Sequence, residues 1–243
     1  GVATYDPIGS TASILLAANE AYEQAQLVGA NAYYIRQGKD QAKDIAEWKS
    51  LVFDIVDTQS YKLSYIGQIE DFQSGQVLME EAFIQAYDKN NDLISIGTFI
   101  SIAEKYAKII DLDKGVIEKV VHYIQAHNLS YAVAINLSAR TIKNSDFRNW
   151  LVQLLQQNQS ISQQLVFTIS SYAVAKESGV YKEFIDFIHS LNAKVMIKRF
   201  ETESMSPEVA KELKPDYIRL ARDLGNGVAN EEGKKVFIET MQG

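Results

Sequence analysis

The chain has 243 residues, of which 47% are hydrophobic and 23% are charged, and these proportions exclude a disordered chain or a fibrous repeat. Its 24 basic and 31 acidic side chains give a net charge of −7, which argues against general binding to nucleic acid or an anionic membrane. It has no cysteine, which excludes disulfides and thiol ligands and permits an intracellular location.

Residues 1–38 predict a small strand–helix–strand segment. Strands over 1–5 and 31–35 flank a helix that begins at Ser10 or Thr11 and ends at Gly29. The charged amphipathic stretch 39–56 predicts a connecting helix, and we place a domain boundary inside it.

From residue 61 onward, strands and helices alternate. Two β-rich runs, 61–72 and 76–87, are separated by Gln73-Ser74-Gly75, which predicts an antiparallel hairpin. The elements expected after it are a helix over 97–127, a strand over 131–138, a helix over 144–157, a strand over 164–170, a helix over 175–191, a strand over 193–200, a helix over 207–213, a strand over 215–221 and a helix near 231–241. Such βα units indicate a parallel sheet covered by helices, either doubly wound or closed as a barrel.

The residues at the strand ends resemble a known family. Gly75–Gln85, GQVLMEEAFIQ, is similar to the strand that names the EAL family of cyclic-di-GMP phosphodiesterases, with Glu81-Ala82-Phe83 in place of Glu-Ala-Leu. Segments 97–117, 134–139 and 214–221 resemble the family's FIPLAE helix, NLS strand and DYIKID strand. Residues 1–34 are similar to the C-terminal tail of a GGDEF domain, the usual tandem partner of EAL.

This resemblance implies an α/β fold: a TIM-like (β/α) barrel of EAL type with an antiparallel first strand, preceded by a small α/β GGDEF remnant. The domains expected are the GGDEF-like part over 1–38, a connecting helix over 39–58 and the EAL-like domain over 59–243. The GGDEF signature would lie before residue 1 and the last two barrel strands after residue 243, so we expect a fragment of a longer protein.

Family members hydrolyse a phosphodiester with divalent metals, and acidic or amide oxygens at the strand ends hold those metals. The resemblance assigns Glu81 and Asn136 to two metal positions, which we interpret as vestigial. The acids expected at the remaining positions are replaced by Thr168, Ser171, Lys198 and Arg199, and the catalytic lysine is replaced by Arg219.

These replacements predict that no catalytic residue remains and that no metal cofactor binds. At an effective dielectric constant near 20, a cation about 4 Å from a metal ion costs roughly 4 kcal/mol per unit charge. Arg219 cannot accept a proton near neutral pH. The alternative is an active metal-dependent cyclic-di-GMP phosphodiesterase, which would need Mg²⁺ or Mn²⁺.

Two interpretations of the remaining charges stay open. Gln85 replaces the family's phosphate-binding arginine, which removes a bidentate phosphate contact, but Lys198, Arg199 and Arg219 could form a metal-free phosphate site, to which we also assign Gln85. Alternatively, Lys198 pairs with Glu81 and replaces the metal with an ion pair.

We therefore expect a catalytically inactive regulatory module from a bacterium, acting as a cyclic-di-GMP receptor or a protein-interaction scaffold. The partners implied are cyclic-di-GMP and another protein, with a homodimer left open. We expect no direct contact with nucleic acid or with a membrane by this fragment. The resemblance implies a cytoplasmic location, in a parent protein that can be anchored to the inner membrane.

Overall fold

The computed structural model describes residues 2–3, 18–19, 21–26, 33–36, 45–200, 205–221, 231 and 235–236. The chain divides into two compact units, one of Gly1–Leu63 with Ile84–Gly115 and the other of Ser64–Phe83 with Val116–Gly243. The predicted boundaries at residues 38 and 58 remain predictions. No helix in the described part of the chain combines the length and apolarity needed to cross a membrane.

The first unit contains short strands and two amphipathic helices. Strand β1 (Val2–Ala3) pairs in parallel with β2 (Ile35–Arg36), and residues 18–19 and 21–26 are helical. Helix α2 (Ile45–Asp57), inside the predicted connecting segment, packs against α3 (Ile96–Lys105). Most of the predicted GGDEF-like segment lies outside the described residues, so that assignment remains a prediction.

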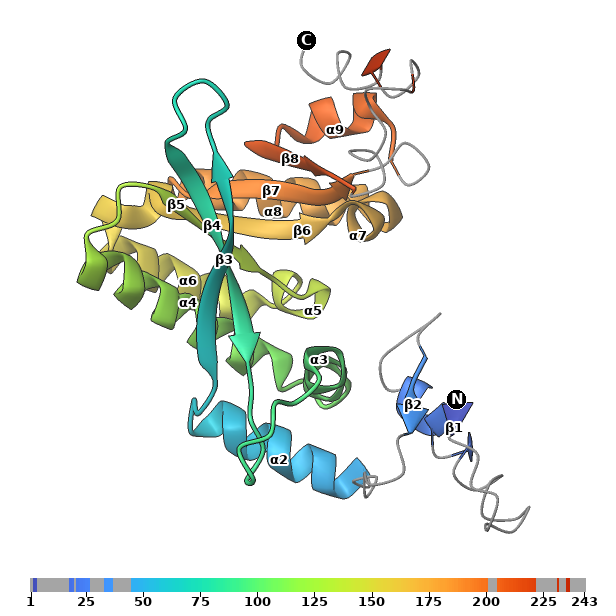
Figure 1. Cartoon of the computed structure of the whole chain (residues 1–243). Helices are drawn as coiled ribbons and strands as arrows, with labels where there is room; N and C mark the ends of the chain where they lie inside the picture. Colours follow the sequence, from blue (N-terminus) through green and yellow to red (C-terminus); the bar gives the residue numbers. More distant parts are fainter. Residues whose placement is uncertain are drawn as a thin grey trace. The chain divides into compact units, whose positions relative to one another are not determined.

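Six strands form one mixed sheet. Their spatial order is the order of the chain: β3 (Lys62–Glu70), β4 (Val77–Gln85), β5 (Ala132–Asn136), β6 (Leu165–Ser170), β7 (Lys194–Phe200) and β8 (Tyr217–Leu220) (Figure 1). The strands from β4 to β8 pair in parallel. A doubly wound sheet reverses its strand order at a switch point, whereas a barrel does not. The sheet is therefore half of a TIM-like barrel, as predicted.

Strands β3 and β4 form the predicted antiparallel hairpin. The Ser64 hydroxyl donates to the Phe83 carbonyl at 3.4 Å, and the Gln68 amide donates to Glu80 at 2.8 Å. From the first contact to the second, the residue number rises along β3 and falls along β4, as it does in an antiparallel pair. Gly67 lies between them with φ of +70°, which allows an irregular residue in β3 at little cost.

Helices follow the parallel strands. They are α4 (Ile109–His127), α5 (Ala139–Ile142), α6 (Ser145–Gln157), the 3₁₀ helix η1 (Gln159–Gln164), α7 (Ser171–Lys176), α8 (Ser178–Ser190) and α9 (Pro207–Leu213). Local chemistry fixes several ends. The Asn144 side chain accepts from the backbone N–H of Phe147 at 2.7 Å and begins α6, and Lys214 ends α9 with φ of +53°.

Three details differ from the predicted elements. The single helix expected over 97–127 is two helices, because Ala107 adopts φ of +59° between α3 and α4. The short helices α5, η1 and α7 were not predicted, since segments of four to six residues carry little hydrophobic periodicity. Most of the helix predicted near 231–241 lies outside the described residues.

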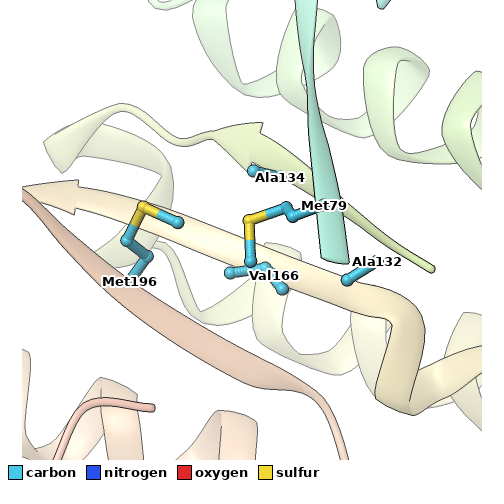
Figure 2. Close-up of a cluster of buried hydrophobic side chains, with 5 residues drawn as sticks. All are labelled: Met79, Ala132, Ala134, Val166 and Met196. Atoms are coloured by element: carbon cyan, nitrogen blue, oxygen red, sulfur yellow. The ribbon is translucent and has the colours of Figure 1, made fainter. Parts of the chain in front are cut away.

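The two faces of the parallel strands bury different side chains. Val133, Phe167 and Val195 point to the helix-covered side and are fully buried. The opposite face, which is the inside of the half-barrel, carries a small apolar cluster (Figure 2). Its members are Met79, Ala132, Ala134, Val166 and Met196. Polar side chains follow this cluster on the same face, two residues further along each strand.

Candidate functional site

The alternation of side chains along the strands places five polar residues on the inner face of the half-barrel. Each lies two residues after a member of the apolar cluster on its own strand or, on β8, after Tyr217, which packs against that cluster. They lie toward the carboxyl ends of the parallel strands, where barrel enzymes keep their active sites. We name this set the mouth network: Glu81, Asn136, Thr168, Lys198 and Arg219.

Glu81 is the centre of the mouth network. Its side chain is buried, and Arg219 Nη1 donates to its Oε2 at 2.6 Å in an ion pair. Asn136 Nδ2 donates to the other oxygen, Oε1, at 2.9 Å. Both carboxylate oxygens are therefore occupied by donors from β5 and β8.

Asn136 links the acid to a second cation. Its carbonyl oxygen Oδ1 accepts from the Thr168 hydroxyl at 2.8 Å and also from Lys198 Nζ. The side-chain amide thus contacts an acceptor on one side and two donors on the other. The predicted Lys198–Glu81 ion pair is corrected by this geometry: Arg219 makes the ion pair, and Lys198 reaches Glu81 through Asn136.

Opposing effects set the pKa of Glu81. Burial of the carboxyl raises its pKa, but hydrogen bonds from Arg219 and Asn136 and the charges of Arg219 and Lys198 outweigh burial, so the net shift is downward from 4.5. Burial lowers the pKa of Lys198 from 10.5 to about 8, with the charges of Arg199 and Arg219 acting in the same direction and Glu81 against them. One carboxylate thus faces two cations.

Arg199 is turned away from this network. It adopts φ of +56°, and the pairing of β7 with β8 shifts register between Lys198 and Phe200. Strict alternation would place the Arg199 guanidinium under the helices, where burying a charge is costly. The bulge leaves its side chain exposed and buries Phe200, while the Ser171 hydroxyl donates to the Arg199 carbonyl at 2.7 Å.

Gln85, the other residue predicted to bind phosphate, is the last residue of β4. The Tyr87 hydroxyl donates to its Oε1 at 3.5 Å. Gln85 belongs to the first compact unit, whereas the mouth network belongs to the second. Of the six predicted site residues, the structure brings together Glu81, Asn136, Lys198 and Arg219, and it adds Thr168 as a hydrogen-bond partner.

The residues of the mouth network do not fit a divalent metal. Such a metal needs several oxygen ligands free of competing cations. Here the Glu81 carboxylate is held by Arg219, and the Asn136 oxygen is held by Lys198 and Thr168. Across the part of the chain that the structure describes, no cluster of three or more His, Cys, Asp or Glu could hold a metal ion.

Comparison with known proteins identifies the family. A family model described as "EAL domain" matches residues 54–242. The solved structure of Vibrio cholerae LapD S helix-GGDEF-EAL bound to c-di-GMP superimposes with a TM-score of 0.77 at 19% identity. That match covers 98% of this chain but only 58% of the LapD chain, so the chain spans less than two thirds of this relative.

Structures of isolated EAL domains give similar matches. The FimX EAL domain from Pseudomonas aeruginosa bound to c-di-GMP has a TM-score of 0.71 at 14% identity, covering 82% of this chain and 79% of that one. The PaMucR phosphodiesterase in complex with c-di-GMP has a TM-score of 0.68 at 15% identity and covers 80% of each chain. At these identities the structures establish a shared fold. No curated protein matches the chain.

We predict that Glu81→Gln destabilises the protein by roughly 1 to 3 kcal/mol at neutral pH, because it leaves two partly buried cations without their counter-charge. Because folding lowers the pKa of Glu81, its stabilisation is complete above the unfolded value of 4.5 and is lost as the pH falls through the folded value. Urea unfolding at several pH values measures both effects, with Glu183→Gln on the exposed face of α8 as the control. Equal or greater stability of Glu81→Gln would contradict the pairing.

We predict the opposite sign for Lys198→Met. Folding lowers the pKa of Lys198 from 10.5 to about 8, so keeping it charged destabilises the fold below pH 8, and this penalty disappears as the pH rises from 8 to 10.5. The variant should be more stable by about 1 to 3 kcal/mol at neutral pH and lose that advantage in alkaline buffer. Asn136 keeps its bond from Thr168. Unfolding of Lys211→Met, at an exposed lysine, should show no such pH dependence.

Proposed function

The chain belongs to the EAL domain family, and on this basis we propose that it is a member that does not hydrolyse cyclic-di-GMP. It works instead as a regulatory module, either as a cyclic-di-GMP receptor or as a scaffold for another protein. The observation that carries the proposal is the ion pair between Glu81 and Arg219, because Glu81 is the one carboxylate of the mouth network that could serve as a metal ligand.

The charges of the mouth network support the proposal that the chain does not hydrolyse cyclic-di-GMP. A metal-activated water needs a cluster of oxygen ligands to hold the metal and a base to receive a proton. The mouth network offers one carboxylate, already paired with Arg219, beside the neutral oxygens of Asn136 and Thr168, and Arg219 keeps its own proton. We therefore assign no catalytic residue and derive no reaction step through a metal.

The receptor version rests on the remaining positive charge. Glu81 balances one of the two cations, so Lys198 and Arg219 together leave an excess of one positive charge beside a partly exposed guanidinium. Arginine and lysine are the usual phosphate-binding side chains. The relatives LapD and FimX were solved bound to c-di-GMP, which makes this ligand the first to measure. The scaffold version needs no ligand in the mouth network.

We predict no turnover when the purified chain is incubated with cyclic-di-GMP and Mg²⁺ or Mn²⁺. Chromatography of the reaction should show the cyclic dinucleotide unchanged, because the ring-opened product needs an activated water that the mouth network cannot supply. Calorimetry in metal-free buffer then separates the two versions: binding selects the receptor and no binding selects the scaffold. Metal-dependent appearance of the linear product would overturn the proposal and establish the phosphodiesterase.

We also predict that the charge of two side chains of the mouth network is what keeps metal out. The native chain should not bind Mn²⁺ measurably, whereas Lys198→Asp with Arg219→Asp should, because it replaces the two cations that hold Asn136 and Glu81 with two oxygen ligands. The matched control is Lys198→Met with Arg219→Met, which removes the cations but adds no ligand. Electron paramagnetic resonance of free Mn²⁺ measures binding, and affinity in the native chain would contradict the prediction.

A further inference from the structure

The β3–β4 hairpin reaches past the other strands of the sheet and ends in a tight turn (Figure 1). We name residues 70–78 the hairpin tip. Strand β4 begins at Val77, directly after the turn, so the tip lies beside the amino ends of the parallel strands. The mouth network lies toward their carboxyl ends, so the hairpin tip is a separate surface.

The turn is held rigid by its own hydrogen bonds. Asp71 Oδ1 accepts from the backbone N–H of Gln73 at 3.1 Å, from that of Ser74 at 2.7 Å and from the Ser74 hydroxyl at 2.7 Å. The backbone N–H of Gly75 donates to the Asp71 carbonyl at 2.8 Å, with Gly75 at φ of +67°. Asp71 therefore organises the loop, and the hydrogen bonds to Ser74 hold the pKa of its carboxyl below the ordinary value.

This rigid turn carries a large aromatic side chain that is fully exposed. Phe72 is 102% exposed and Leu78 is 47% exposed. An aromatic side chain that gains nothing from its own fold, held on a pre-organised loop, is typical of an interface anchor, because little conformational entropy is lost on binding.

The charged residues that neighbour Phe72 in the sequence are all negative. Glu70 and Asp71 precede it directly, and the sequence has no Lys, Arg or His between Lys62 and Lys89. A second copy of the same tip would bring like charges together, and an anionic membrane would repel them. A partner with basic groups around an apolar pocket is complementary in both shape and charge.

We propose that the hairpin tip is a docking surface for a folded protein partner that offers an apolar pocket for Phe72, with basic side chains around that pocket. Phe72 supplies the anchor, and Glu70 and Asp71 supply the attraction and the orientation. This surface does not depend on the occupancy of the mouth network. Binding at the tip can therefore be measured whether or not cyclic-di-GMP binds.

The first experiment places the photo-cross-linking residue p-benzoylphenylalanine at position 72 of the full chain in the cell that produces it. The control places the same residue at Tyr172, which is 63% exposed and lies in the first turn of α7, near the carboxyl end of β6. We expect one protein to be cross-linked from position 72 and not from position 172. The absence of such a product, or a product formed only with a second copy of this chain, overturns the proposal.

The second experiment measures affinity between the purified chain and that purified protein. Phe72→Ala should weaken binding at least tenfold, Gln73→Ala should leave it within twofold, and both variants should unfold at the temperature of the native chain. Added salt should weaken binding, and Glu70→Gln should reduce that salt dependence. Unchanged affinity of Phe72→Ala overturns the proposal, as does binding of the native chain to vesicles of phosphatidylcholine and phosphatidylglycerol that the Phe72→Ala variant loses.

Discussion

The ion pair between Glu81 and Arg219 is the interaction on which the inside of the half-barrel depends. Glu81 is almost entirely buried, and a carboxylate in that position needs a cation, a metal or a proton to balance it. Arg219 supplies the cation from the last described strand, and Asn136 supplies a second donor from the strand beside β4. Strands far apart in the sequence are thereby joined by charge at the end of the sheet where the apolar cluster stops.

The sequence predicted most of the fold because the strands are strongly patterned. Runs such as 131–138 and 164–170 alternate with amphipathic helices, and the observed strands end within two residues of those limits. Periodicity did not distinguish a barrel from a doubly wound sheet, since only the spatial order of the strands does so. It also missed the break at Ala107, which a single residue with positive φ produces within an otherwise continuous helical pattern.

The candidate site was predictable in its members but not in its pairing. The resemblance indicated that Glu81, Asn136, Lys198 and Arg219 share the strand ends, and the structure brings these four together. Which cation contacts Glu81 depends on the length of the side chain that crosses the half-barrel. The Arg219 guanidinium contacts Glu81, whereas Lys198 donates to Asn136. The outward turn of Arg199 follows from a bulge in β7, and no local sequence signal announces a bulge.

Stability and function make different demands on the two ends of this sheet. At the carboxyl ends, Glu81 is paired with Arg219 and bonded by Asn136 inside the half-barrel, so these side chains join β4, β5 and β8. At the amino ends, the Asp71 side chain accepts hydrogen bonds from the backbone of its own turn, and Phe72 stays exposed to water. A surface that contributes nothing to the core is free to change without unfolding the protein, whereas each member of the mouth network is tied to at least one other. On the proposed function, the hairpin tip can therefore contact a protein partner without disturbing the half-barrel that presents it.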